Sequence, residues 1–108
     1  MSTTNKRLAG TTLITNAAVT YYTVPASTVT MVQHIHVSNP TALAVGFTMS
    51  AVTDAVGTRI YDNYQIPAGG VLDVFTKYVM TAGQVLQASA STTNVLTLTV
   101  DGVELTPG

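Results

Sequence analysis

The feature of this sequence that most constrains its fold is a series of short segments rich in β-branched residues and divided by turn signals. These segments cover residues 8–13, 18–24, 29–38, 42–52, 58–66, 71–76, 84–90 and 95–105. Helical spacing of apolar residues is nowhere sustained, and Val and Thr favour strands. The pattern predicts an all-β, eight-stranded antiparallel β-sandwich of jelly-roll type, with no helix longer than about two turns.

The length of 108 residues predicts a single domain. We expect this β-sandwich domain to span residues 8–108 and to follow a polar leader at residues 1–7. Such leaders are usually frayed ends of the chain. In an assembly, the leader could instead be an arm that contacts a neighbour through Lys6 and Arg7.

Alternate apolar residues predict which strand faces meet in the core, because successive side chains of a strand point to opposite faces. Three sets are expected to face inward: Leu43, Val45, Phe47, Met49 and Ala51; Val29, Met31, Ile35 and Val37; and Leu96, Leu98 and Val100. The pair Asp101-Gly102 then predicts a tight type I′ turn, since both central positions of that turn need positive φ.

One turn pattern recurs at Val24–Val29, Ile66–Val71 and Met80–Val85. Each copy has an apolar residue, Pro or Thr, Ala, a small residue, a spacer and Val. Pro suits the early part of a turn and Gly tolerates positive φ. Because the copies are unequally spaced, repeated turn chemistry explains them better than duplication.

The composition is poor in charge, with 8% charged and 46% hydrophobic residues and a net charge of −1. Two interpretations stay open: outer faces covered by copies or partners, or a neutral Thr-coated extracellular domain. Four strong cations are too few for nucleic-acid binding. No apolar run reaches the roughly 18 residues that span a bilayer, and the first ten residues lack the apolar stretch of a secretion signal. The absence of cysteine excludes disulfides.

The pair His34 and His36 is a candidate for metal binding, because residues i and i+2 of a strand share a face. A third ligand would have to come from a scattered acid such as Asp62 or Asp73. We expect instead two solvent-facing histidines opposite the Met31, Ile35 and Val37 face, and therefore no metal. A pH-sensitive interface is a further option.

No catalytic constellation is visible in the sequence. The acids are Asp54, Asp62, Asp73, Asp101 and Glu104, without an evident carboxylate pair, nucleophile motif or phosphate loop. We therefore expect no enzyme activity and no cofactor.

The run Tyr61-Asp62-Asn63-Tyr64 is the most polar and aromatic part of the chain, and its four residues are candidate contacts for a sugar or a protein. The alternative is an ordinary strand. In that case Ile60, Asp62, Tyr64 and Ile66 share one face, and Arg59, Tyr61 and Asn63 share the other.

The stretch Tyr22-Thr23-Val24-Pro25-Ala26, followed by a strand that ends at Val37-Ser38-Asn39, resembles small virion proteins of tailed phages. Residues 66–70 and 81–86 and the closing run 88–105 resemble the same group. The resemblance implies a β-sandwich, often a jelly roll, that works as an oligomer on the particle. It implies no catalytic residues.

From this resemblance we predict a capsid decoration (cement) protein that stabilises the head by binding across capsid subunits. Its partner would be the major capsid protein or another virion protein, on the surface of a particle assembled in the host cytoplasm. The alternatives are a tail, neck or fibre component and, from another class, a carbohydrate-binding module.

We also expect a homo-oligomer, a trimer or dimer. Residues 42–52 and 84–100 carry no charge, and strand edges without charge invite pairing unless a partner covers them.

Overall fold

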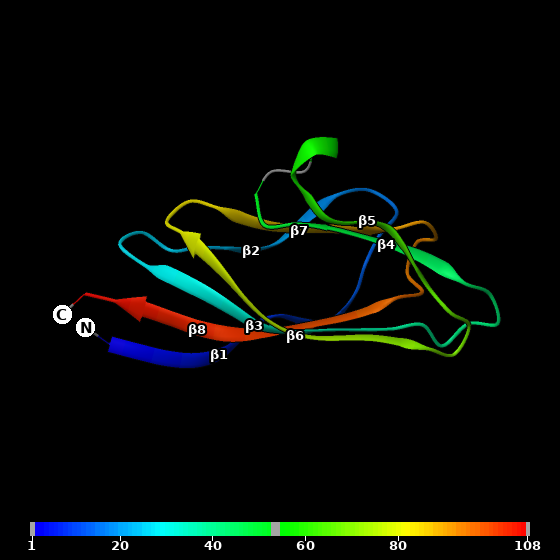
Figure 1. Cartoon of the computed structure of the whole chain (residues 1–108), viewed down its shortest axis with the longest axis horizontal. Coiled ribbons are helices and arrows are strands. Elements are labelled where there is room, and N and C mark those ends of the chain that lie inside the picture. The colour runs from blue at the N-terminus through cyan, green and yellow to red at the C-terminus, as the bar shows by residue number, and fades with distance from the viewer. Residues whose placement is uncertain (1, 53–54, 108) are drawn as a thin grey trace.

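The computed structural model describes residues 2–52 and 55–107, which form two antiparallel four-stranded sheets packed face to face (Figure 1). Sheet A has the order β1 (Ser2–Leu13), β8 (Thr97–Thr106), β3 (Val29–Ser38) and β6 (Val71–Thr81). Sheet B has the order β2 (Val19–Thr23), β7 (Val85–Ala90), β4 (Val45–Ser50) and β5 (Arg59–Ile66). Across the described ranges the one helical element is a 3-10 turn at Val56–Thr58.

The strand order is that of a jelly roll. The pairs β1–β8, β2–β7, β3–β6 and β4–β5 are nested along the chain, and they alternate between the two sheets. A chain folded on itself once and then wrapped around a core gives this order. The predicted eight-stranded antiparallel sandwich is therefore confirmed, and both ends of the chain lie at one end of the molecule (Figure 1).

The core lies between the sheets and consists of alternate apolar residues. Its largest fully buried side chains are Phe47, Ile14, Ile35, Met49, Ile66, Met80, Leu86, Leu96, Leu98, Val24, Val32 and Val37. The predicted inward positions Val45, Phe47 and Met49 of β4 are confirmed, as are Leu96, Leu98 and Val100. Leu43 was expected beside them but is 75% exposed, because it precedes the first residue of β4 and lies in a loop.

The predicted inward face of β3 is wrong in its first half. Val29 and Met31 point outward, whereas Thr30 and Val32 are buried. A register shift against both neighbouring strands lies between Val32 and His34. An extra residue at a bulge reverses the face of every residue beyond it.

The predicted turn at Asp101-Gly102 is also wrong, since β8 runs through both residues to Thr106. Gly102 lies where the chain of β3 comes close. A Cβ at this position would lie 2.3 Å from the backbone oxygen of Met31. The glycine is needed for this close approach rather than for a turn.

The three recurring turns share a positive φ at one position. Ser27, Gly69 and Gly83 occupy the same place in the three patterns, and all have positive φ of 57°, 66° and 86°. In the second and third turns the amide after this residue donates to the carbonyl three residues back, from Gly70 to Pro67 and from Gln84 to Thr81. Positive φ at the third position is the geometry of a type II turn.

The expected leader is not a separate segment. Residues 2–7 form the first half of β1 and pair with the last residues of β8, from Ser2 opposite Thr106 to Arg7 opposite Asp101. This pairing provides hydrogen-bond partners for the backbone N–H and C=O groups of residues 2–7, a stretch that the side-chain pattern did not predict to be a strand.

The prediction that the uncharged segments are exposed strand edges is wrong. The uncharged segments 42–52 and 84–100 contribute β4, β7 and part of β8, which all lie inside their sheets. The edges are β1, β6, β2 and β5. Of these, β2 is the one strand without a charged residue.

Candidate functional site

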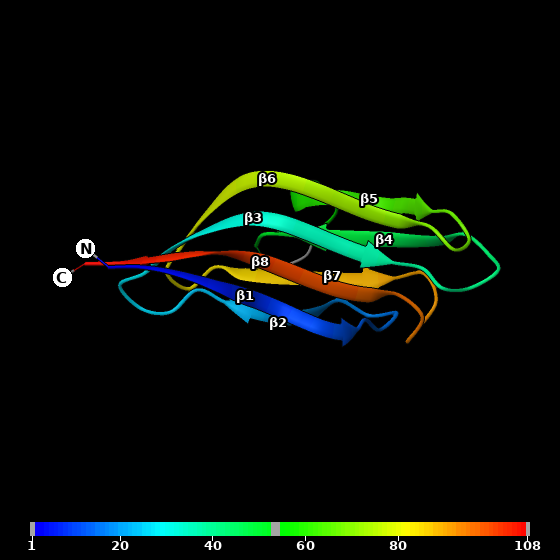
Figure 2. The same ribbon diagram turned by 90° about the horizontal axis from the view of Figure 1, so that it is seen from below.

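The charges of this protein are concentrated on sheet A. Within the described ranges, every Lys, Arg, Asp and Glu except Arg59 and Asp62 lies on β1, β6 or β8. Lys6 and Glu104 lie at a contact with sheet B. Arg7, Asp73 and Asp101 pair with each other or with histidines on the outer face of sheet A, which is turned toward the viewer in Figure 2. We take this face as the candidate functional site.

A cross-strand row centred on His34 crosses this face. In an antiparallel sheet, residues directly opposite one another share a face. His34 lies opposite Phe75 on β6 and Asp101 on β8, and Asp101 lies opposite Arg7 on β1. The rings of His34 and Phe75 are stacked, with centroids 4.5 Å apart and planes 9° apart.

The carboxylate of Asp101 bridges this row. One oxygen lies 3.6 Å from Nδ1 of His34, and the other lies 3.7 Å from Nε of Arg7. His34 is therefore held by a ring on one side and by a carboxylate on the other.

The next row adds a second histidine and a second acid. His36 lies opposite Asp73 on β6. Oδ1 of Asp73 accepts a hydrogen bond from Nε2 of His34 and contacts Nδ1 of His36 at 3.2 Å. One ligating atom from each of these three residues can be chosen so that all three atoms lie within 4.8 Å of one another. We call His34, His36 and Asp73 the histidine cluster.

The electrostatics of the histidine cluster follow from these contacts. The hydrogen bond between His34 and Asp73 raises the pKa of His34 above the ordinary 6.5. Bonds from His34 and His36 lower the pKa of Asp73 below the ordinary 3.8. The ionised carboxylate can only accept, so the ring nitrogens that face it carry protons.

Apolar side chains continue the same face beyond the cluster. Phe75 and Val79 of β6 are 78% and 59% exposed, and Met31 and Val29 of β3 also point outward. Met31 lies directly opposite Val79. We call Val29, Met31, Phe75 and Val79 the apolar strip.

Lys6 and Arg7 are paired within the sheet, and they face different partners. Nζ of Lys6 lies 3.4 Å from Glu104, whereas Arg7 pairs with Asp101 on the outer face. Glu104 also accepts a hydrogen bond from the hydroxyl of Tyr22 on sheet B, so Lys6 pairs with an acid that joins the two sheets. Burial and this bond raise the pKa of Tyr22 to about 12.

The run from Tyr61 to Tyr64 lies on β5, away from sheet A. Tyr61 lies opposite Met49 and Tyr64 opposite Phe47, so both rings share the face that points to the core. The predicted alternation fails here because of a register shift between the two pairs, where Asn63 has a positive φ of 52°. The two rings meet edge to face at 6.0 Å.

The polar members of this run have local partners. Asp62 pairs with Nη1 of Arg59 at 3.0 Å. The amide of Asn63 donates to the hydroxyl of Thr48. Tyr64 remains half exposed, whereas Tyr61 packs against the core.

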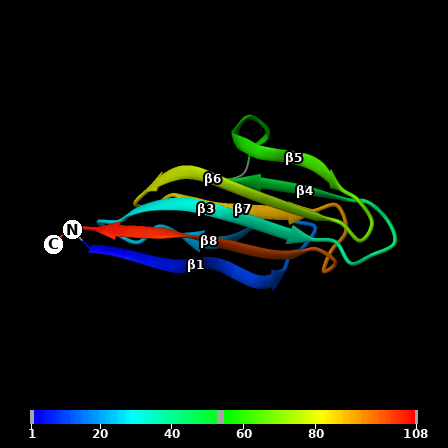
Figure 3. The ribbon, with the colours of Figure 1, turned by 60° about the horizontal axis from the view of Figure 1, so that its bottom comes forward.

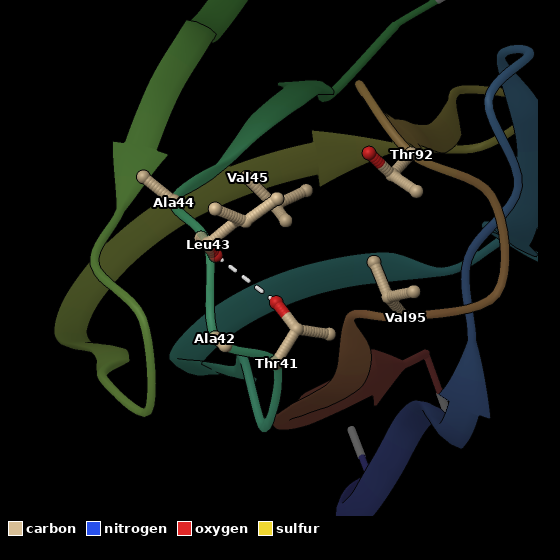
Figure 4. A pocket seen from close by; sticks show the side chains of 7 residues that line it. All are labelled: Thr41, Ala42, Leu43, Ala44, Val45, Thr92 and Val95. Carbon is tan, nitrogen blue, oxygen red and sulfur yellow. Dashed lines mark hydrogen bonds between the residues drawn. The ribbon is translucent and has the colours of Figure 1, made fainter.

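A pocket of about 310 Å³ is shown in Figure 4. The loops that line it lie at the end of the sandwich away from the termini (Figure 3). The pocket lies between the loop before β4 and the loop before β8. Its lining is Thr41, Ala42, Leu43, Ala44, Val45, Thr92 and Val95. These side chains include no acid, base or charged group.

The described acids are Asp62, Asp73, Asp101 and Glu104, each paired with a cation or a histidine, and Asp54 lies outside the described residues. Sequence reasoning named the two histidines and considered Asp73, but it missed Phe75 and the role of Asp101. No sequence signal could have joined these residues, because they come from three strands far apart in the chain.

Comparisons of the chain with protein-family models, curated proteins and solved structures find no match. No helix among residues 2–52 and 55–107 is long and apolar enough to cross a membrane.

Proposed function

We propose that this protein is a structural component of a tailed-phage particle, and specifically a capsid decoration protein that stabilises the head by binding across adjacent capsid subunits. The observation that carries the proposal is the outer face of sheet A, where the apolar strip lies beside ionised side chains. Lys77 of β6 is also exposed, between Phe75 and Val79. Exposed apolar side chains interspersed with charges are typical of a protein contact surface.

Two further observations support an assembly role. Double-sheet jelly rolls are used by viral capsid proteins as well as by lectins. The turn chemistry at Tyr22–Ala26 and Ile66–Gly70 resembles that of phage virion proteins. Each contact would be weak, but many copies on one lattice raise the effective concentration of their neighbours.

The test is a binding assay on purified phage heads that lack this protein. We expect the wild-type protein to coat the head lattice, as seen by electron microscopy. The double variant Phe75→Ser, Val79→Ser should lose most of this binding. Leu43→Ser, which removes an equally exposed apolar side chain outside the strip, should bind like the wild type.

The outcomes separate this proposal from its alternatives. If the protein were found only on the tail or neck of the particle, it would be a tail component and not a capsid decoration protein. Absence from the particle would overturn both. A carbohydrate-binding role is favoured by one observation, the half-exposed Tyr64 beside Tyr61. It predicts glycan-array binding that is lost in Tyr61→Ala and Tyr64→Ala.

A further inference from the structure

We propose that His34, His36 and Asp73 bind one divalent transition-metal ion of the zinc class, and that Asp101 orients His34 for this role. The sequence offered a pair of histidines and scattered acids, Asp62 and Asp73 among them, as possible third ligands. The fold supplies the third ligand from β6, directly opposite His36.

The three ligating atoms lie close enough together to be brought around one ion. Two ligating atoms that are each about 2.1 Å from a tetrahedral zinc ion lie roughly 3.4 Å apart. The candidate atoms lie within 4.8 Å of one another. Small rotations of partly exposed side chains therefore bring them into range, and an ion would take the place of the protons that Asp73 now shares with both rings.

The surroundings of His34 resemble the outer shell of a metal site. A ligating histidine commonly donates its other ring N–H to a carboxylate, which fixes the orientation of the ring. In His34, Nε2 faces Asp73 and Nδ1 faces Asp101 at 3.6 Å. Phe75 stacks on the same ring, so its orientation is constrained before any ion binds.

The ligand set selects the class of metal. Two imidazoles and one carboxylate suit zinc, copper, nickel or ferrous iron, whereas calcium and magnesium prefer shells of oxygen atoms. Three protein ligands leave one position of a tetrahedral ion for water or a donor from a partner. The partly exposed cluster leaves such a donor room to approach.

The experiment uses the untagged full chain, freed of metal with a chelator, and titrates it with zinc chloride by calorimetry and thermal unfolding. We expect one ion per chain and a rise in the unfolding midpoint of about 10 °C at zinc concentrations about 100-fold above the dissociation constant. Cobalt should give the visible absorption of a tetrahedral site, and zinc should displace it.

Variants distinguish ligands from the orienting carboxylate. Asp73→Asn and His36→Gln should abolish the midpoint rise and the cobalt absorption. Asp101→Asn should keep the absorption but weaken binding about 10-fold or more. Asp62→Asn, an exposed acid paired with Arg59 on the other sheet, should bind like the wild type.

Circular dichroism identifies any variant that fails to fold. If one of the two ligand variants is unfolded, zinc binding by the other one tests the proposal. No heat of zinc binding to the wild type would overturn the proposal. So would equal binding in Asp73→Asn and His36→Gln, or a magnesium affinity equal to that for zinc.

Discussion

Asn39 shows how one buried amide can join three segments. It is 1% exposed, and its Nδ2 lies within hydrogen-bond distance of the carbonyl oxygens of Leu43, Ile66 and Pro67, at 2.8, 3.0 and 3.2 Å. Its Oδ1 accepts bonds from the backbone N–H and the hydroxyl of Thr41. The loop before β4 and the end of β5 are therefore fixed to the end of β3.

We predict that Asn39→Asp lowers the free energy of unfolding by about 3 kcal/mol. The change keeps the shape but removes the donors, and it places a carboxylate against carbonyl oxygens. Urea denaturation measures the loss. Asn16→Asp, at an exposed position, serves as the control and should change stability by less than about 0.5 kcal/mol. Equal stability of the two variants would show that the amide does not join these segments.

The pair of His34 and Asp73 predicts a pH dependence of stability in the presence of a chelator. The pKa of His34 is raised, so its contribution is complete below the ordinary 6.5 and is lost as the pH rises through the higher folded value. The pKa of Asp73 is lowered, so its contribution is present above the ordinary 3.8 and is lost as the pH falls through the lower folded value. The pair therefore stabilises the fold most between these two ordinary values.

Urea denaturation of the wild type and Asp73→Asn at a series of pH values measures this dependence. The stability difference should be largest near pH 5 and should shrink as the pH rises above the ordinary pKa of histidine, 6.5. His36, Asp101 and Arg7 face the same pair and are unchanged in both proteins. A difference that grows as the pH rises above 6.5 would contradict the assignment.

At the scale of elements, bulges decide which residues reach which face. The register shift in β3 turns Val29 and Met31 outward and places His34 and His36 on one outer face with them. Gly102 of β8 allows β3 to approach beside this bulge. The apolar strip and the histidine cluster therefore share a face because of one irregularity.

We predict that Gly102→Ala destabilises the fold by about 2–3 kcal/mol. The added Cβ would lie 2.3 Å from a backbone oxygen, which cannot move without disturbing the ladder. Gly57→Ala is the control, since a Cβ there meets nothing within 4 Å. Thermal unfolding of both variants checks the prediction, and a tolerated Gly102→Ala would mean that β3 can shift away.

At the scale of the whole molecule, the protein is an elongated jelly roll with extents of 49 × 24 × 19 Å and two different outer surfaces. Sheet A carries nearly all the charges and the apolar strip, whereas β2 forms a short uncharged edge of sheet B. Edges of this kind pair readily with another chain unless charge or a cover protects them.

We predict that the protein is a dimer or trimer that uses the β2 edge. Sedimentation at about micromolar concentration should give a mass above that of one 11.3 kDa chain. Val19→Lys, which adds a charge to β2, should shift the equilibrium toward monomer, whereas Leu43→Lys should not. A single 11.3 kDa species at all concentrations would contradict an oligomer.

The sequence by itself determined the fold class and most of the core. Alternation depends on neighbouring residues alone, so Phe47, Met49, Leu98 and Val100 could be placed inward without knowledge of their partners. The repeated turns were also predictable, because positive φ is a local property of the residue.

Only the tertiary structure decided which strands pair and where their register shifts. Bulges depend on what lies across the ladder, so the outward turn of Met31 and the shared face of Tyr61 and Tyr64 could not be inferred from alternation. The same pairing turned residues 2–7 into a strand. The histidine cluster exists because strands distant in sequence are neighbours in sheet A, a long-range fact that no local pattern encodes.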